Sequence, residues 1–166
     1  MGSANTVLLL PHQERFLQSP KNFPDIRWHF LLAGYGAGKT RSLAISTLNI
    51  IYELDGEKDD GGLYAKVAVA GYTYAHLEQT FMVDFRAYLE ASKTPYHEDT
   101  KNHIITVGTV QVFFLQLLEP GKIFGQSIHC CLCDEIDELE EDVMIEAMKS
   151  VSQRCRQVIP NHRSRS

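Results

Sequence analysis

The sequence lacks three features that would have indicated a membrane protein, a secreted protein or a nucleic-acid-binding protein. No apolar run approaches the roughly 20 residues that a membrane-spanning helix needs. The N-terminal stretch has no basic segment, and its apolar run is too short for a secretory signal peptide. With 21 acidic and 16 basic residues, the net charge is −5, which counts mildly against a role in handling DNA.

Cysteine is also scarce, with four residues in the chain. Three of them lie in one apolar run, Ser127–Cys133, and the fourth is Cys155. His129 stands beside Cys130, but the spacing is not that of a zinc site, so a metal is the less favoured alternative. We interpret these cysteines as small hydrophobic residues in a buried strand.

The length and composition predict one globular domain over residues 1–166. A chain of 166 residues can bury a core, and 44% hydrophobic with 22% charged residues is typical of globular proteins. Apolar periodicity predicts helices over Pro11–Ser19, Thr40–Leu54, Leu77–Leu89 and Leu139–Met148. It predicts strands over Trp28–Ala33, Ala65–Ala70, His103–Val107, Val110–Phe114 and Ser127–Cys133.

This alternation of strands and helices predicts an α/β fold with helices on the faces of a sheet. The third and fourth strands should form a hairpin that turns near Gly108 and Thr109. The segment Pro20–Pro24 should end the first helix, and Asp55–Gly62 should be an exposed loop.

The glycine-rich segment "AGYGAGKT" follows the first predicted strand and opens a helix. It matches the Walker A pattern with Ala in the first position, so its backbone N–H groups should surround a phosphate. Lys39 should reach the β- and γ-phosphates of ATP, and the Thr40 hydroxyl should bind Mg²⁺. The predicted nucleotide-binding residues of this segment are Ala33, Gly34, Tyr35, Gly36, Ala37, Gly38, Lys39, Thr40 and Arg41.

A second acidic motif, "IHCCLCDEIDEL", should complete the site. Asp134 follows a predicted buried strand, at the edge where α/β sheets bind ligands, and should hold Mg²⁺ through water. Glu135 should act as general base and orient the attacking water, so Glu135 and Lys39 are the predicted catalytic residues. Upstream, Gln13 is a weaker candidate for pairing with adenine, because an amide matches the N6 and N7 edge of that base.

Together these segments resemble the large terminase subunit of tailed bacteriophages, the ATPase that drives DNA into the capsid. The resemblance covers roughly residues 7–158 and rests on "LLLPHQERFL", "FLLAGYGAGKTRS", "VAVAGYTYAHLEQTF", "ITVGTVQVFF", "EPGKIFGQS" and "LCDEIDEL". Walker motifs are shared by many NTPases, whereas their order with the hairpin and the Gly125 segment is more specific. The resemblance implies a P-loop NTPase of the additional-strand, RecA-like class, with a mostly parallel sheet, an inserted β-hairpin and Glu135 as catalytic glutamate.

The chain departs from the family at two cationic positions. Terminases often carry Arg inside the phosphate loop, where this chain has Tyr35, and Arg before the second motif, where it has Lys122 and then Phe124. Such an Arg stabilises charge on the transferred phosphate, and Lys122 is a weaker substitute. The sequence therefore leaves the charge-stabilising role unassigned.

The chain also ends early for this family. In this class the strand after the second motif's helix inserts between the two motif strands, and a nuclease domain follows. Either Val151–Ile159 forms that strand or the sheet lacks a central member, which would leave backbone groups unpaired. We expect the N-terminal part of a split or truncated terminase, incomplete at its C-terminus, without the nuclease domain and completed by a second polypeptide.

Three functions stay open from the sequence. The first is a DNA-packaging ATPase, and the second is a superfamily-2-like helicase or other DNA translocase with the acids Asp134, Glu135 and Asp137. The third is an assembly module that binds ATP without hydrolysing it.

The resemblance to terminases implies double-stranded DNA, portal protein and small terminase subunit as partners, a homo-oligomeric ring, and the host cytoplasm as location. We interpret the basic cluster of Arg154, Arg156, His162, Arg163 and Arg165 as a solvated tail.

Overall fold

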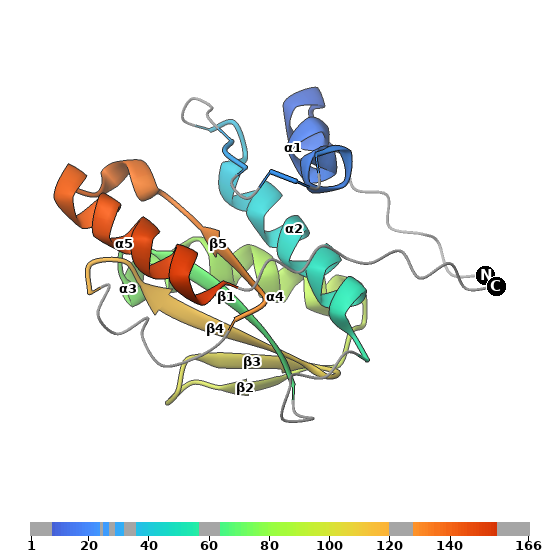
Figure 1. Ribbon diagram of the computed structural model, residues 1–166. Coiled ribbons are helices and arrows are strands. Elements are labelled where there is room, and N and C mark those ends of the chain that lie inside the picture. Colours follow the sequence, from blue (N-terminus) through green and yellow to red (C-terminus); the bar gives the residue numbers. More distant parts are fainter. Residues whose placement is uncertain are drawn as a thin grey trace.

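A five-stranded sheet forms the centre of the part of the chain that the computed structural model describes, residues 8–23, 25–26, 29–31, 36–56, 64–119 and 128–155. The helices are α1 Pro11–Asn22, α2 Lys39–Leu54, α3 Tyr74–Gln79, α4 Phe81–Ala91 and α5 Glu141–Arg154, with a 3₁₀ helix at Ile136–Glu138 (Figure 1). The strands are β1 Ala65–Gly71, β2 His97–Asp99, β3 Ile104–Val107, β4 Val110–Gln116 and β5 Cys130–Cys133.

The strand order is β2-β3-β4-β1-β5, and the sheet is mixed. Strand β1 pairs in parallel with both β4 and β5, whereas β3 pairs antiparallel with β2 and β4. The expected mostly parallel sheet therefore holds only for β4, β1 and β5. The turn between β3 and β4 lies at Gly108 and Thr109, as the sequence predicts, and Gly108 has a φ of +55° there.

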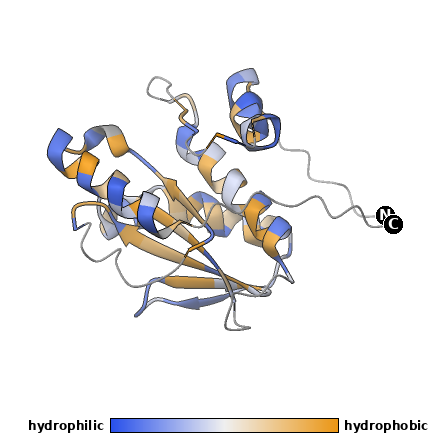
Figure 2. Ribbon diagram, in the orientation of Figure 1, coloured by the Kyte–Doolittle hydropathy of each residue, from blue (hydrophilic) through white to orange (hydrophobic). Residues whose placement is uncertain are grey.

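Helices cover both faces of the sheet, as expected for an α/β protein. On one face, residues of α2, α3 and α4 pack with Val67 and Val69 of β1 in the larger hydrophobic cluster. On the other face, α5 contributes Ala147 and Val151 to a smaller cluster with Ala70. The strands at the centre are strongly hydrophobic, as Figure 2 shows. Within the described residues, none of the helices combines the length and apolar character required to cross a membrane.

The first helix is longer than predicted, because it continues through Pro20 to Asn22. A proline has no N–H group, so the carbonyl oxygen of Phe16 cannot receive its usual hydrogen bond from position 20. The hydroxyl of Ser19 donates to that oxygen instead, at 2.7 Å. This bond satisfies the carbonyl that proline leaves without its helical partner.

The predicted strand Trp28–Ala33 is wrong for its described residues, 29–31. His29, Phe30 and Leu31 are described and do not belong to a strand, and Phe30 is 55% exposed. Trp28, Leu32 and Ala33 lie outside the described residues. An apolar run predicts a buried strand only if neighbouring strands cover it, and the described sheet ends at β5 instead.

The predicted helix Leu77–Leu89 is two helices, α3 and α4, that meet at Thr80. Thr80 has φ −116° and ψ −86°, which is not helical. Its hydroxyl donates to the carbonyl oxygen of His76 at 2.8 Å, a local bond that competes with the helical pattern. Strand β2 was not predicted, because its sequence "HED" is short and polar and carries no apolar alternation.

Residues Val151–Arg154 belong to α5, so they do not form the strand considered for Val151–Ile159. Directly after this helix, Cys155 makes an isolated parallel bridge with Ile128, just before β5. The remaining positions 156–166, which include most of the predicted basic tail, lie outside the described residues.

Candidate nucleotide-binding site

Helix α1 braces the predicted phosphate loop. The side-chain amide nitrogen of Gln13 donates to the carbonyl oxygens of Gly38, at 3.1 Å, and Ala37, at 3.4 Å. The Nε2 atom of His12 lies 3.0 Å from the same Ala37 oxygen. Gln13 is only 3% exposed, and its own oxygen accepts from the N–H of Leu10 at 2.8 Å. Two side chains of α1 therefore hold the backbone that leads into α2.

The loop needs glycine at two of its described positions. Gly36 and Gly38 have φ values of +73° and +74°, which residues with a Cβ rarely adopt. A Cβ on Gly38 would also overlap the amide nitrogen of Gln13. Gly38 thus meets both a conformational and a steric requirement. Ala33, Gly34 and Tyr35, the other predicted loop positions, lie outside the described residues.

The two predicted motifs come together at the start of α2 and the end of β5. Lys39 and Thr40 form the first turn of α2, and Asp134 follows the last residue of β5. The Thr40 hydroxyl hydrogen-bonds Asp134, and the charge of Lys39 acts on the same carboxylate. These residues are distant in sequence, so their contact depends on the sheet and on the packing of α2 against it.

Asp134 is a buried carboxylate that suits a cation. It is 4% exposed, and its Oδ2 atom has no hydrogen-bond partner among the described residues. Burial raises the pKa of Asp134, and the Thr40 hydrogen bond with the charges of His76 and Lys39 offsets only part of that effect. Carboxylate and hydroxyl oxygens are the ligands that Mg²⁺ prefers, so Thr40 and Asp134 fit the predicted magnesium site.

Glu135 has an unusual backbone and a partner that the sequence did not indicate. Its φ of +52° places a non-glycine residue in the left-handed region. Its Oε2 atom contacts the Nε2 atom of His76, which lies on α3. Because Ala70 pairs with Cys133 in the parallel register, the segments that follow β1 and β5 emerge side by side. That adjacency is the only signal that could have linked His76 to Glu135.

Arg41 and Gln13, two further predicted nucleotide-binding residues, make contacts with other parts of the protein. Arg41 is exposed, and its Nε atom donates to the hydroxyl of Tyr88 on α4 at 2.6 Å. The amide of Gln13 faces the loop backbone rather than open solvent. Adenine recognition by Gln13 and nucleotide contact by Arg41 therefore stay predictions. The alternative cation Lys122 lies outside the described residues.

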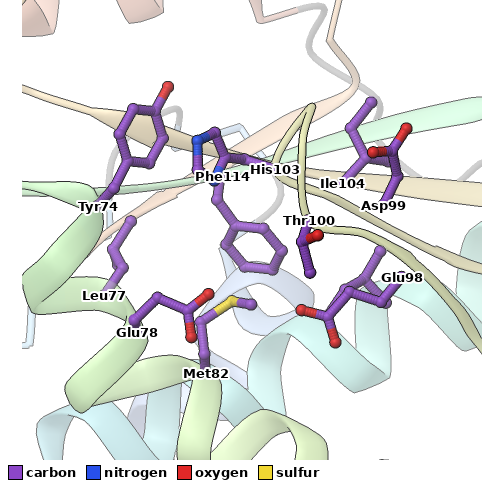
Figure 3. A pocket seen from close by; sticks show the side chains of 11 residues that line it. Tyr74, Leu77, Glu78, Met82, Glu98, Asp99, Thr100, His103, Ile104 and Phe114 are labelled. Carbon is purple, nitrogen blue, oxygen red and sulfur yellow. The ribbon is translucent and has the colours of Figure 1, made fainter.

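A separate small pocket lies between α3, α4 and the β2–β3 hairpin (Figure 3). Its lining residues are Tyr74, Leu77, Glu78, Met82, Glu98, Asp99, Thr100, His103, Ile104, Ile105 and Phe114. None of the predicted nucleotide-binding residues belongs to this lining. The pocket is thus distinct from the candidate site.

The fold is similar to that of bacteriophage large terminases. The large terminase of a thermophilic bacteriophage matches with a TM-score of 0.64 at 15% identity, covering 88% of this chain and 37% of that one. The same protein in complex with ADP matches with a TM-score of 0.68 at 15% identity, over 87% and 36%. The large terminase ATPase domain of Thermus phage P74-26 matches with 0.50 at 13% identity, over 73% and 53%.

These matches confirm the resemblance read from the sequence at the level of the fold. The chain spans little more than a third of the length of the large terminase from the thermophilic bacteriophage. No protein-family model and no curated protein matches the chain.

Proposed function

We propose that this chain is the ATP-binding and ATP-hydrolysing part of a phage DNA-packaging motor. The observation that carries the proposal is the meeting of Thr40 and Lys39 with the buried carboxylate of Asp134. A fold shared with large terminases, solved in one case with ADP and in another with ATP-γ-S, supports it further.

The residues divide the chemistry of phosphoryl transfer between them. The loop backbone up to Gly38 and the N-terminus of α2 bind the phosphates, and Lys39 neutralises charge on the β- and γ-phosphates. Thr40 and, through water, Asp134 would hold Mg²⁺, which would offset the charge of the phosphate oxygens. Glu135 accepts a proton from the attacking water and orients it for in-line attack on the γ-phosphate.

The motor role adds partners to this ATPase. We propose that the whole assembly acts on double-stranded DNA, with a portal protein and a small terminase subunit, as a ring in the host cytoplasm. The fold similarity supports these partners only through the family. The helicase alternative shares the same site chemistry and would differ in its partner, since it separates strands rather than filling a capsid.

The test is Mg-ATP binding and steady-state hydrolysis by the purified chain. We expect Lys39→Ala to abolish ATP binding, and Glu135→Gln to retain binding while hydrolysis falls at least about a hundredfold. Lys149→Ala, an exposed residue on α5, is the matched control and should behave like wild type. Binding without any hydrolysis in the wild type would instead favour the non-hydrolysing module, and unchanged ATP binding by Lys39→Ala would overturn the proposed site.

A further inference from the structure

The contact between His76 and Glu135 joins the predicted general base to a residue outside both Walker motifs. The Nε2 atom of His76 faces the Oε2 atom of Glu135, and their side chains are 30% and 25% exposed. The contact is therefore shielded from most of the solvent, which strengthens an electrostatic interaction. His76 also acts on the charge of Asp134, so it lies close to the centre of the site.

The backbone of Glu135 is held in a conformation that directs its side chain. A φ of +52° is unfavourable for glutamate by about 1–2 kcal/mol, and such strain concentrates at functional sites. The carbonyl oxygen of Glu135 accepts from the N–H of Glu138 at 3.1 Å, which closes the turn after Asp134. The turn fixes the direction of the Cα–Cβ bond of Glu135. The torsion angles farther along the side chain need a second restraint.

His76, the other residue of the contact, is also held in place, because contacts anchor the first turn of α3. The N–H of His76 donates to the hydroxyl of Thr73, the N-cap of α3, at 3.1 Å. The ring of Tyr74 stacks on His103, with centroids 4.1 Å apart and planes 11° apart. Both contacts fix the first turn of the helix that carries His76.

Arg86 holds the C-terminal end of α3 through hydrogen bonds. Arg86 of α4 donates to Glu78 at 3.0 Å and to Glu98 of β2 at 3.1 Å, and Glu78, Glu98, Tyr74 and His103 all line the pocket in Figure 3. The contacts of Tyr74 and Glu78 with the hairpin and α4 therefore flank His76 along the helix. The position of the imidazole is set by packing on both sides of it.

We propose that His76 is a positioning residue that holds the carboxylate of Glu135 in place for water activation. This inference rests on the proposed function, since it concerns how the general base is oriented. Restraining a flexible glutamate before the reaction removes part of the entropic barrier, and small misplacements of such a group reduce rates strongly.

The kinetic test compares His76→Ala with His76→Gln, whose amide nitrogen can take the place of Nε2 beside the Glu135 carboxylate. We expect His76→Ala to lower kcat for Mg-ATP about ten- to a hundredfold with little change in KM, and His76→Gln to recover part of the loss. His97→Ala, an exposed histidine on β2, is the control and should keep the wild-type rate. In a Glu135→Gln background, His76→Ala should cause no further loss. A further loss of similar size in the Glu135→Gln background would overturn the proposal. So would a rise in KM as large as the fall in kcat.

A second measurement does not depend on turnover. In ¹H–¹⁵N spectra of the histidine rings at one pH, Glu135→Gln should shift the His76 signals and leave those of His97 unchanged. Unshifted His76 signals would overturn the pairing. ATP binding that survives Lys39→Ala would overturn the nucleotide site itself, so the two failures are distinguishable.

Discussion

The side chain of Gln13 is hydrogen-bonded to the backbone of Gly38, with its amide nitrogen 3.1 Å from the carbonyl oxygen. This bond joins α1 to the residue that precedes α2, at the end of the predicted phosphate loop. The same carbonyl oxygen accepts from the N–H and the hydroxyl of Ser42 within α2, so Gln13 adds a partner from a second helix. The geometry of the loop therefore depends on a helix that contains none of its residues.

Replacing Gln13 with Ala should lower the free energy of unfolding by about 1–2 kcal/mol, because the carbonyl oxygens of Ala37 and Gly38 each lose one of their donors and the N–H of Leu10 loses its acceptor. Chemical denaturation measures this change, with Gln18→Ala, an exposed residue of the same helix, as the control. If Gln13 acts through the loop, ATP and GTP affinities should fall together. A loss confined to ATP would support the adenine contact predicted from the sequence instead.

Gly38→Ala should abolish nucleotide binding. The variant combines a left-handed φ, unfavourable for alanine by about 1–2 kcal/mol, with an overlap between its Cβ and the Gln13 amide. Gly56→Ala is the matched control, because Gly56 has a φ of +88° but no neighbouring atom within 4 Å of the added Cβ. Titration with a fluorescent ATP analogue compares them. Equal binding by both variants would contradict the steric role of Gly38.

Arg86→Gln should destabilise the protein by about 1 kcal/mol, because a partly exposed arginine loses two carboxylate partners. Arg86→Lys should recover only part of this stability, since an ammonium cannot reproduce the separate hydrogen bonds to Glu78 and Glu98. The melting temperature reports both effects, with the exposed Arg15→Gln as control. A lysine variant as stable as the wild type would show that only charge matters at this position.

The thiol of Cys130 should be unreactive in the folded protein. Burial, aided by the nearby Cys155 and Cys133, raises the pKa of Cys130 from an ordinary value of 9.0 to about 12. The unfolded thiol ionises first as the pH rises, so the stability contributed by this residue should decline from about pH 9 toward about pH 12. Denaturation curves at about pH 8 and about pH 10.5 should therefore differ less in Cys130→Ala than in the wild type. An identical pH dependence in both proteins would refute the shift.

The sequence by itself predicted the elements whose residues carry their own periodicity. Helix α2 and strand β1 match their predictions closely, because a helical apolar stripe and a short run of β-branched and small residues each specify local structure. The Walker motifs also identified Lys39, Thr40, Asp134 and Glu135 as candidates, since phosphate and magnesium chemistry restrict the residue types in those positions.

The tertiary structure decided what depends on neighbours distant in the chain. The exposure of Phe30 appears only in the folded chain, since an apolar run by itself does not show whether other strands cover it. The pairing of His76 with Glu135 arises because β1 and β5 lie parallel in one register, which brings the ends of two distant segments together. A lone histidine in a helix carries no spacing pattern, so only the folded sheet could assign it a partner.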